Sequence, residues 1–133
     1  MNRKDCEEFR AEMVHHLTEE LLPFWMNRVL DTVNGGYITQ FDENGTDSGE
    51  DEKSLIAQTR TVYTMSAAHR AGYGDGRCAE YARHGVSFLL DKMWDREYGG
   101  FFWTVNRKGD VKIPKKILYG HSLDRKSTRL NSS

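Results

Sequence analysis

A chain of 133 residues is long enough to bury a hydrophobic core, and its length favours a single domain. Its 19 basic residues nearly balance its 20 acidic ones, so the charge gives no reason to expect nucleic acid as a partner. Hydrophobic residues make up 38% and aromatic residues 11% of the chain, which is too much for a disordered protein.

The sequence contains no secretory signal and no membrane span. Residues 1–13, MNRKDCEEFRAEM, lack the apolar stretch of a signal peptide. No apolar run approaches the ~18 residues that a helix needs to cross a bilayer. Cys6 and Cys78 have no second cysteine at a metal-binding or redox spacing, so we interpret them as free thiols in a reducing compartment. These features predict a cytoplasmic protein.

The first predicted helix spans residues 4–30. Its apolar residues recur every three or four positions along one helical face: Phe9, Met13, Leu17, Leu21 and Phe24. Pro23 removes an interior N–H donor, so we expect a kink or a restart of the helix there. A short strand-like stretch, residues 36–41, and an acidic loop, residues 42–52, follow.

Two further helices are predicted, at residues 51–71 and 75–94. Ser48 and the acidic loop favour the start of the first, and the glycines of AGYGDG separate the two. The residues expected to face inward are Leu55, Ile56, Thr59, Val62, Tyr63, Ser66 and Ala67 on the first, and Cys78, Tyr81, Ala82, Gly85, Phe88, Leu89 and Met93 on the second. A strand at 101–105 and a turn at 107–110 come next, and Pro114 is expected to open a fourth helix.

One unit of the sequence occurs twice, 64 positions apart. DTVNGGYITQFDENG, residues 31–45, aligns with DREYGGFFWTVNRKG, residues 95–109, and each contains a Gly-Gly pair followed by an aromatic residue. Glycine accepts a positive φ, which lets a helix stop and the chain turn sharply. A fixed period that holds two helices and one hairpin is typical of repeat architectures, in which each unit packs on the next.

Residues 123–133, LDRKSTRLNSS, interrupt this pattern, because they contain two apolar residues in eleven and no helical stripe. We interpret them as translated adapter or vector sequence, with a genuine disordered terminus as the alternative. The sequence thus predicts a truncated domain over residues 1–122 and a foreign tail over residues 123–133. The fourth helix, residues 114–122, is expected to continue further in the natural protein, because so short a helix is marginal alone.

Four segments resemble the N-acylglucosamine 2-epimerase superfamily and, within it, the cellobiose 2-epimerases: PFWMNRVLDTVNGGY, LIAQTRTVYTMSAAH, YGGFFWTVNRKG and KKILYGHS. The resemblance covers about residues 7–122 and only the first third of a family member. It implies a mainly α fold, the N-terminal part of an (α/α)6 barrel or six-hairpin toroid. This chain would supply about four of the helices and two short β-hairpins.

The resemblance also implies a reaction at C2 of a reducing sugar. In that family histidines remove and return the C2 proton, which gives the C2 epimer or the C1 isomer, and neither a metal nor another cofactor is needed. Those histidines lie in later repeats. We therefore expect a parent isomerase with a small sugar as its substrate, and a chain that is inactive by itself. Its oligomeric state is left open, and two units alone are expected to be molten or to aggregate.

Four sugar-binding residues are predicted. Arg60, in AQTRTVY, matches the family arginine that reaches the carbonyl end of the sugar, where a guanidinium stabilises an enediolate oxygen. Tyr119 and His121, in KKILYGHS, match positions that line the substrate, although relatives do not all have histidine at the second. Trp103 would stack on a sugar ring. The alternatives are an ion-paired or surface role for Arg60 and core packing for Tyr119 and Trp103.

Other histidines and other functions give weaker signals. His15, His16, His69 and His84 have no metal-binding spacing and are expected to be structural or solvated, so no metal site is predicted. A glycoside hydrolase on the same toroid stays open, but it needs two carboxylates across the scissile bond and no such pair stands out. A helical-repeat module without chemistry also stays open, and it would need a complete, capped array.

Overall fold

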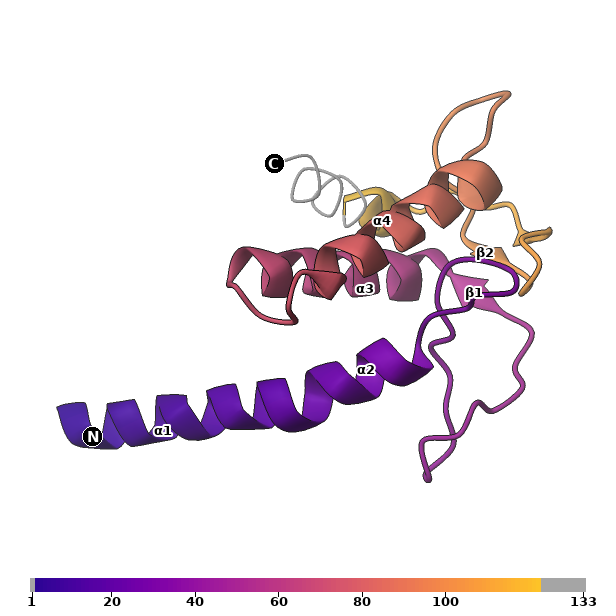
Figure 1. The fold of residues 1–133 in the computed structure, drawn as a ribbon. Helices are drawn as coiled ribbons and strands as arrows, with labels where there is room; N and C mark the ends of the chain where they lie inside the picture. The colour runs from indigo at the N-terminus through magenta and orange to yellow at the C-terminus, as the bar shows by residue number, and fades with distance from the viewer. Residues whose placement is uncertain (1, 123–133) are drawn as a thin grey trace.

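The computed structural model describes residues 2–122, so the predicted tail, residues 123–133, lies outside the described residues. The chain is mainly α-helical, as predicted (Figure 1). Its elements follow in this order: α1, Arg3–His16; the π-helical turn η1, Leu17–Leu21; α2, Leu22–Arg28; β1, Lys53–Ser54; α3, Leu55–Arg70; α4, Arg77–Phe88; the π-helical turn η2, Leu89–Met93; β2, Thr104–Val105; and β3, Val111–Ile113.

The first helical path is continuous through α1, η1 and α2. Pro23 sits in the first turn of α2, directly after η1, where the N–H of Leu22 donates to the carbonyl of Leu17. A π-helical turn is wider than an α-helical one and is a common form of interruption inside a helix. The interruption predicted at Pro23 therefore takes the form of a wide turn just before it.

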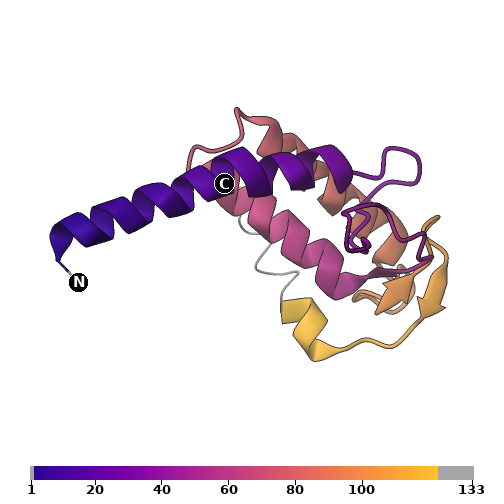
Figure 2. The same cartoon turned by 90° about the horizontal axis from the view of Figure 1, so that it is seen from below.

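The N-terminal half of this path stands clear of the rest of the molecule (Figures 1 and 2). α1 has no buried residue, and Phe9 and Met13 on its apolar face are 57% and 44% exposed. The path becomes buried at Leu22 and Met26 of α2, which join a core cluster with Met65 of α3.

α3 and α4 pack side by side and form the centre of the described residues (Figure 1). The predicted inward face of the second helix is confirmed, since all of its residues except the half-buried Tyr81 are buried. On α3, Leu55, Thr59, Val62 and Ser66 are buried as predicted, whereas the other three predicted residues are only half-buried: Ile56, Tyr63 and Ala67. Gln58, which is not among the predicted inward residues, is also fully buried.

The predicted start of α3 at residue 51 is wrong. Lys53 and Ser54 form β1, which pairs antiparallel with β2, Lys53 opposite Val105 and Ser54 opposite Thr104. β2 also pairs with β3, which gives a sheet in the order β1-β2-β3. Ser54 rather than Ser48 then caps the helix, because its Oγ accepts the N–H of Ala57 at 3.2 Å.

The other predicted hairpin and helix boundaries need correction as well. Residues 36–41 form no strand, and the first hairpin closes through a bridge between Phe41 and Asp47. The strand predicted at 101–105 shortens to β2. Pro114 does not open the last predicted helix. The helical segment there spans residues 118–122. Residues 114–117 are irregular instead. Lys116, within this stretch, pairs with Asp95, with 2.5 Å between Nζ and Oδ2.

The two Gly-Gly units form the same turn, so the predicted repeat is confirmed. The N–H of Asp31 donates to the carbonyl of Gly36 at 3.0 Å, and the N–H of Asp95 donates to that of Gly100 at 2.8 Å. In return the N–H of Gly35 and of Gly99 donate to the carbonyls of Asp31 and Asp95. All four glycines have φ between 69° and 83°, a region that favours glycine.

Candidate functional site

Arg60 and Tyr119 lie 59 positions apart in the sequence but touch in the structure. Arg60 Nη2, on the second turn of α3, donates to the Tyr119 hydroxyl at 3.0 Å. Tyr119 belongs to the short helical segment 118–122, and both side chains are exposed. Two of the predicted sugar-binding residues thus form one exposed pair.

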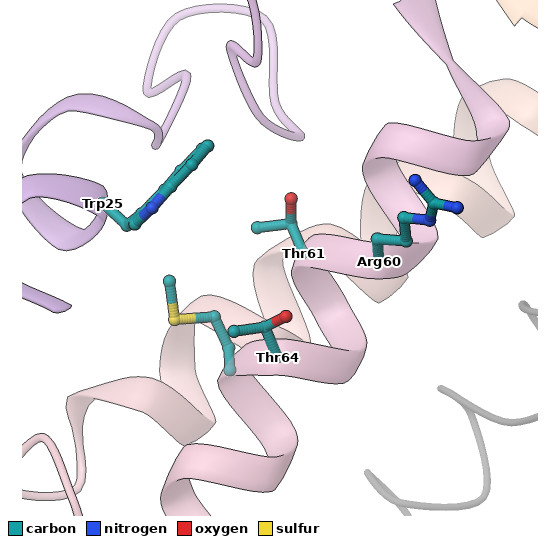
Figure 3. Close-up of a pocket in the computed structure, with 5 residues that line it drawn as sticks. Trp25, Arg60, Thr61 and Thr64 are labelled. Atoms are coloured by element: carbon teal, nitrogen blue, oxygen red, sulfur yellow. The ribbon is translucent and has the colours of Figure 1, made fainter. Parts of the chain in front are cut away.

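Arg60 also borders a pocket of about 240 Å³ between α2 and α3 (Figure 3). The other lining residues are Trp25, Thr61, Thr64 and Met65. In Figure 3 the indole of Trp25 faces Thr61 across the space, whereas the Arg60 guanidinium points away from Trp25. This volume is below the roughly 300–1,000 Å³ that small-molecule sites usually have, so the pocket by itself is too small to enclose a disaccharide.

Trp103 packs against the segment that carries Tyr119. Its carbonyl accepts the N–H of Leu55 at 2.9 Å, and its own N–H donates to the carbonyl of Ile113 at 3.1 Å. A Cβ atom placed on Gly120 would lie 3.3 Å from Trp103 Cζ3 and 2.7 Å from Leu55 Cδ2. The absence of a side chain at Gly120 therefore lets segment 118–122 approach the half-buried indole.

Both ring nitrogens of His121 bind protein backbone. Nε2 lies 2.8 Å from the nitrogen of Phe101, and Nδ1 lies 3.0 Å from the carbonyl oxygen of Ile117. Because a backbone N–H can only donate, Nε2 is the acceptor, and Nδ1 carries the proton that goes to Ile117. His121 is thus a neutral imidazole turned toward the second Gly-Gly turn.

Lys53 and Asp31 form a buried ion pair that sequence reasoning missed. Lys53 is 1% exposed, and its Nζ donates to Asp31 Oδ2 at 2.7 Å and to the carbonyls of Gly35 and Arg107 at 2.6 and 3.1 Å. Burial acts to raise the pKa of Asp31, but hydrogen bonds from Lys53 and Asn34 outweigh it and hold that pKa below its usual value. The repeat of Asp31 as Asp95, 64 positions later, could have indicated a structural role for this aspartate. The sequence contains no sign of its lysine partner, because no lysine lies 64 positions after Lys53.

Arg107 ties the acidic loop to the second hairpin. Its guanidinium forms a bidentate pair with Asp47, with 2.7 Å between Nη1 and Oδ2, and its Nε donates to the carbonyl of Glu50 at 2.7 Å. The hydrogen bonds from Arg107 lower the pKa of the Asp47 carboxyl to about 2. The two hairpins are therefore held together by charge as well as by the β1-β2 pairing.

Within residues 2–122, no three His, Cys, Asp or Glu side chains gather in a way that would bind a metal ion. Among the helices of those same residues, none combines the length and the apolar character of a membrane span. His16 pairs with Glu20, and His84 contacts the carbonyl of Gly36.

Comparisons with known proteins agree on one family. Residues 36–123 match the sequence model of N-acylglucosamine 2-epimerase. A cellobiose 2-epimerase of Bacteroides fragilis is 33% identical over 113 residues, which is 85% of this chain and 29% of the relative. A mannose-6-phosphate isomerase of Rhizobium meliloti is 32% identical over 106 residues, 77% of this chain and 25% of the relative.

A solved structure shows the same fold. The cellobiose 2-epimerase of Spirochaeta thermophila DSM 6192 aligns with a TM-score of 0.83 at 24% identity, over 98% of this chain and 35% of that one. The helices and Gly-Gly turns described above thus form about a third of an (α/α)6 barrel. This chain spans less than a third of the length of the curated relatives that it matches. Since the family model covers more than half of the sequence, the chain belongs to the N-acylglucosamine 2-epimerase family.

Proposed function

We propose that the protein to which this chain belongs converts a reducing sugar into its C2 epimer or into the corresponding ketose. Relatives named as a cellobiose 2-epimerase and as a mannose-6-phosphate isomerase support this reaction class. The observation that carries the proposal is the exposed hydrogen-bonded pair of Arg60 and Tyr119. Membership of the family favours this chemistry over a glycoside hydrolase or a non-catalytic repeat module.

The pair is suited to a sugar whose C2 proton is being removed. Loss of that proton from the open-chain sugar places negative charge on the C1 oxygen, which becomes the charged oxygen of an enediolate. The Arg60 guanidinium keeps its charge throughout and can stabilise this enediolate without a change of protonation. The Tyr119 hydroxyl accepts from Arg60, so its own proton is available for donation to a sugar oxygen.

The remaining residues receive supporting roles in this proposal. Trp103 packs beside Gly120 and thereby backs the segment that carries Tyr119. We assign proton transfer at C2 to histidines outside this chain, because both ring nitrogens of His121 bind backbone groups. The free thiols Cys6 and Cys78 support a reducing, cytoplasmic location.

Sugar binding by the 133-residue chain tests the proposal. Cellobiose, mannose and N-acetylglucosamine would each be titrated while tryptophan fluorescence is followed, and products would be separated by chromatography. Arg60→Lys removes the planar fork, and Tyr119→Phe removes the hydroxyl, so each should weaken binding of the preferred sugar by roughly tenfold. Arg70→Lys, at the exposed end of the same helix, is the matched control and should leave binding unchanged.

Two results would contradict the proposal. If no sugar binds, or if Arg60→Lys and Tyr119→Phe bind as the unaltered chain does, the pair is not a sugar contact. If the chain alone forms an epimer or a ketose, the proton-transfer groups lie within it, and their assignment to another part of the protein is wrong.

A further inference from the structure

The two Gly-Gly turns are each held by two side chains from the segment that follows. In the first unit these are Lys53 and Gln58, and in the second they are Lys116 and His121. Each lysine binds the Oδ2 atom of the aspartate that begins its turn, at 2.7 Å for Lys53 with Asp31 and at 2.5 Å for Lys116 with Asp95. In both segments the second side chain follows the lysine by five positions.

Gln58 and His121 each accept a hydrogen bond from the backbone N–H at the equivalent position of their turns. Gln58 Oε1 accepts the N–H of Tyr37, the residue after the first Gly-Gly pair, at 2.9 Å. His121 Nε2 accepts the N–H of Phe101, the residue after the second pair, at 2.8 Å. An amide oxygen and an unprotonated imidazole nitrogen are equivalent acceptors for this purpose.

The glycines confirm that the two acceptors occupy equivalent places. A Cβ atom on Gly36 would lie 2.7 Å from Gln58 Oε1, and a Cβ atom on Gly100 would lie 2.8 Å from His121 Nε2. In each turn the second glycine thus leaves the space that the acceptor needs. Lys116 and His121 lie 63 positions after Lys53 and Gln58, whereas the turns themselves are 64 apart, so one fixed offset does not align all of these residues.

We infer that Lys116 and His121 form a turn clamp, the repeat counterpart of Lys53 and Gln58, and that His121 is a positioning residue. The clamp fixes segment 118–122 against the second Gly-Gly turn, and Tyr119 lies between its two members. It thereby sets where the Tyr119 hydroxyl meets Arg60. Only this last consequence rests on the proposed function, since the clamp itself follows from the geometry of the turns.

Rescue by the counterpart residue tests the inference. Hydrogen exchange of the Phe101 amide would be measured in the 133-residue chain and in the variants His121→Gln and His121→Leu, with the Tyr37 amide as the internal reference. Glutamine supplies the acceptor that Gln58 uses, so His121→Gln should keep the protection of Phe101. His121→Leu removes the acceptor and should lower that protection by roughly tenfold, while Tyr37 stays protected.

Each other outcome overturns the clamp. The inference is wrong if the Phe101 amide is unprotected in the unaltered chain, if His121→Leu leaves it protected, or if glutamine fails to restore it. Should His121→Leu unfold the whole chain, so that Tyr37 also exchanges freely, the glutamine variant decides by the same criterion. A loss of sugar binding in His121→Gln with Phe101 still protected would make the imidazole a sugar contact and overturn the positioning role, while the function proposed for Arg60 and Tyr119 would stand.

Discussion

At the scale of single residues, the chain contains two equivalent lysine–aspartate ion pairs that differ in burial. Lys53 and Asp31 are almost completely buried, with side chains 2% and 5% exposed, whereas Lys116 is 31% exposed beside Asp95. A charge in a dry interior must be paired and hydrogen-bonded, and Lys53 meets this need with one carboxylate and two carbonyls. Loss of one partner is therefore far more damaging inside than at the surface.

We expect Lys53→Met to lower the free energy of unfolding by about 3–5 kcal/mol, because it leaves the Asp31 carboxylate buried without its cation. Lys116→Met is the matched control and should cost clearly less, since water reaches its site. Urea denaturation followed by circular dichroism measures both variants. Equal losses in the two would show that burial does not distinguish the pairs.

At the scale of elements, the tight turns decide where helices begin and end. Gly36 takes a φ of +69° and lies against Gln58 and Phe88, so both its backbone and its missing side chain are needed. Gly49 takes a similar φ of +79° in the acidic loop, but a Cβ atom placed there would have no neighbour within 4 Å. Substitutions at Gly36 and Gly49 therefore separate the free-energy cost of a positive φ from the cost of a side-chain clash.

Gly36→Ala should therefore destabilise the chain by about 2–4 kcal/mol, through strain at positive φ together with overpacking. Gly49→Ala should cost only about 1 kcal/mol, the backbone contribution alone. Thermal or urea unfolding of the two variants side by side gives the difference. If Gly49→Ala is as harmful as Gly36→Ala, the contact with Gln58 and Phe88 contributes nothing.

The start of α3 shows why element boundaries resist prediction from sequence. The acidic residues before Lys53 favour a helix N-terminus, and that local preference placed the start at residue 51. The pairing of Lys53 and Ser54 with β2 outweighs it, and this partner lies about 50 positions further along the chain. The predicted start of the last helix at Pro114 is wrong for a similar reason. Lys116, in the irregular residues 114–117, pairs with Asp95, about 20 positions earlier in the chain.

At the scale of the whole molecule, α1 is the least integrated element. It projects from the body in both views and buries no residue, although Phe9 and Met13 lie on its apolar face (Figures 1 and 2). Ile117, Leu118 and Tyr119 are exposed at the other end of the described residues. Apolar surface of this kind promotes association in water.

We expect the 133-residue chain to self-associate, and analytical ultracentrifugation over a range of concentrations measures this. The double variant Phe9→Ser with Met13→Ser should shift the equilibrium toward monomer, because it removes apolar area from α1. Glu12→Ser is the control, because it changes the same exposed helix without removing apolar area. A chain that stays monomeric at every concentration would contradict this expectation.

The sequence by itself determined the mainly helical fold, the inward face of α4 and the repeated Gly-Gly turn, because these depend on periodicity and on the backbone freedom of glycine. It also pointed to Arg60 and Tyr119 through resemblance to a family. Only the tertiary structure decided that these two side chains touch, that Lys53 is buried with Asp31, and that His121 accepts the N–H of Phe101. Each of these contacts joins residues at least 20 positions apart, and the packing of α3, the sheet and the turns, rather than local propensity, brings such residues together.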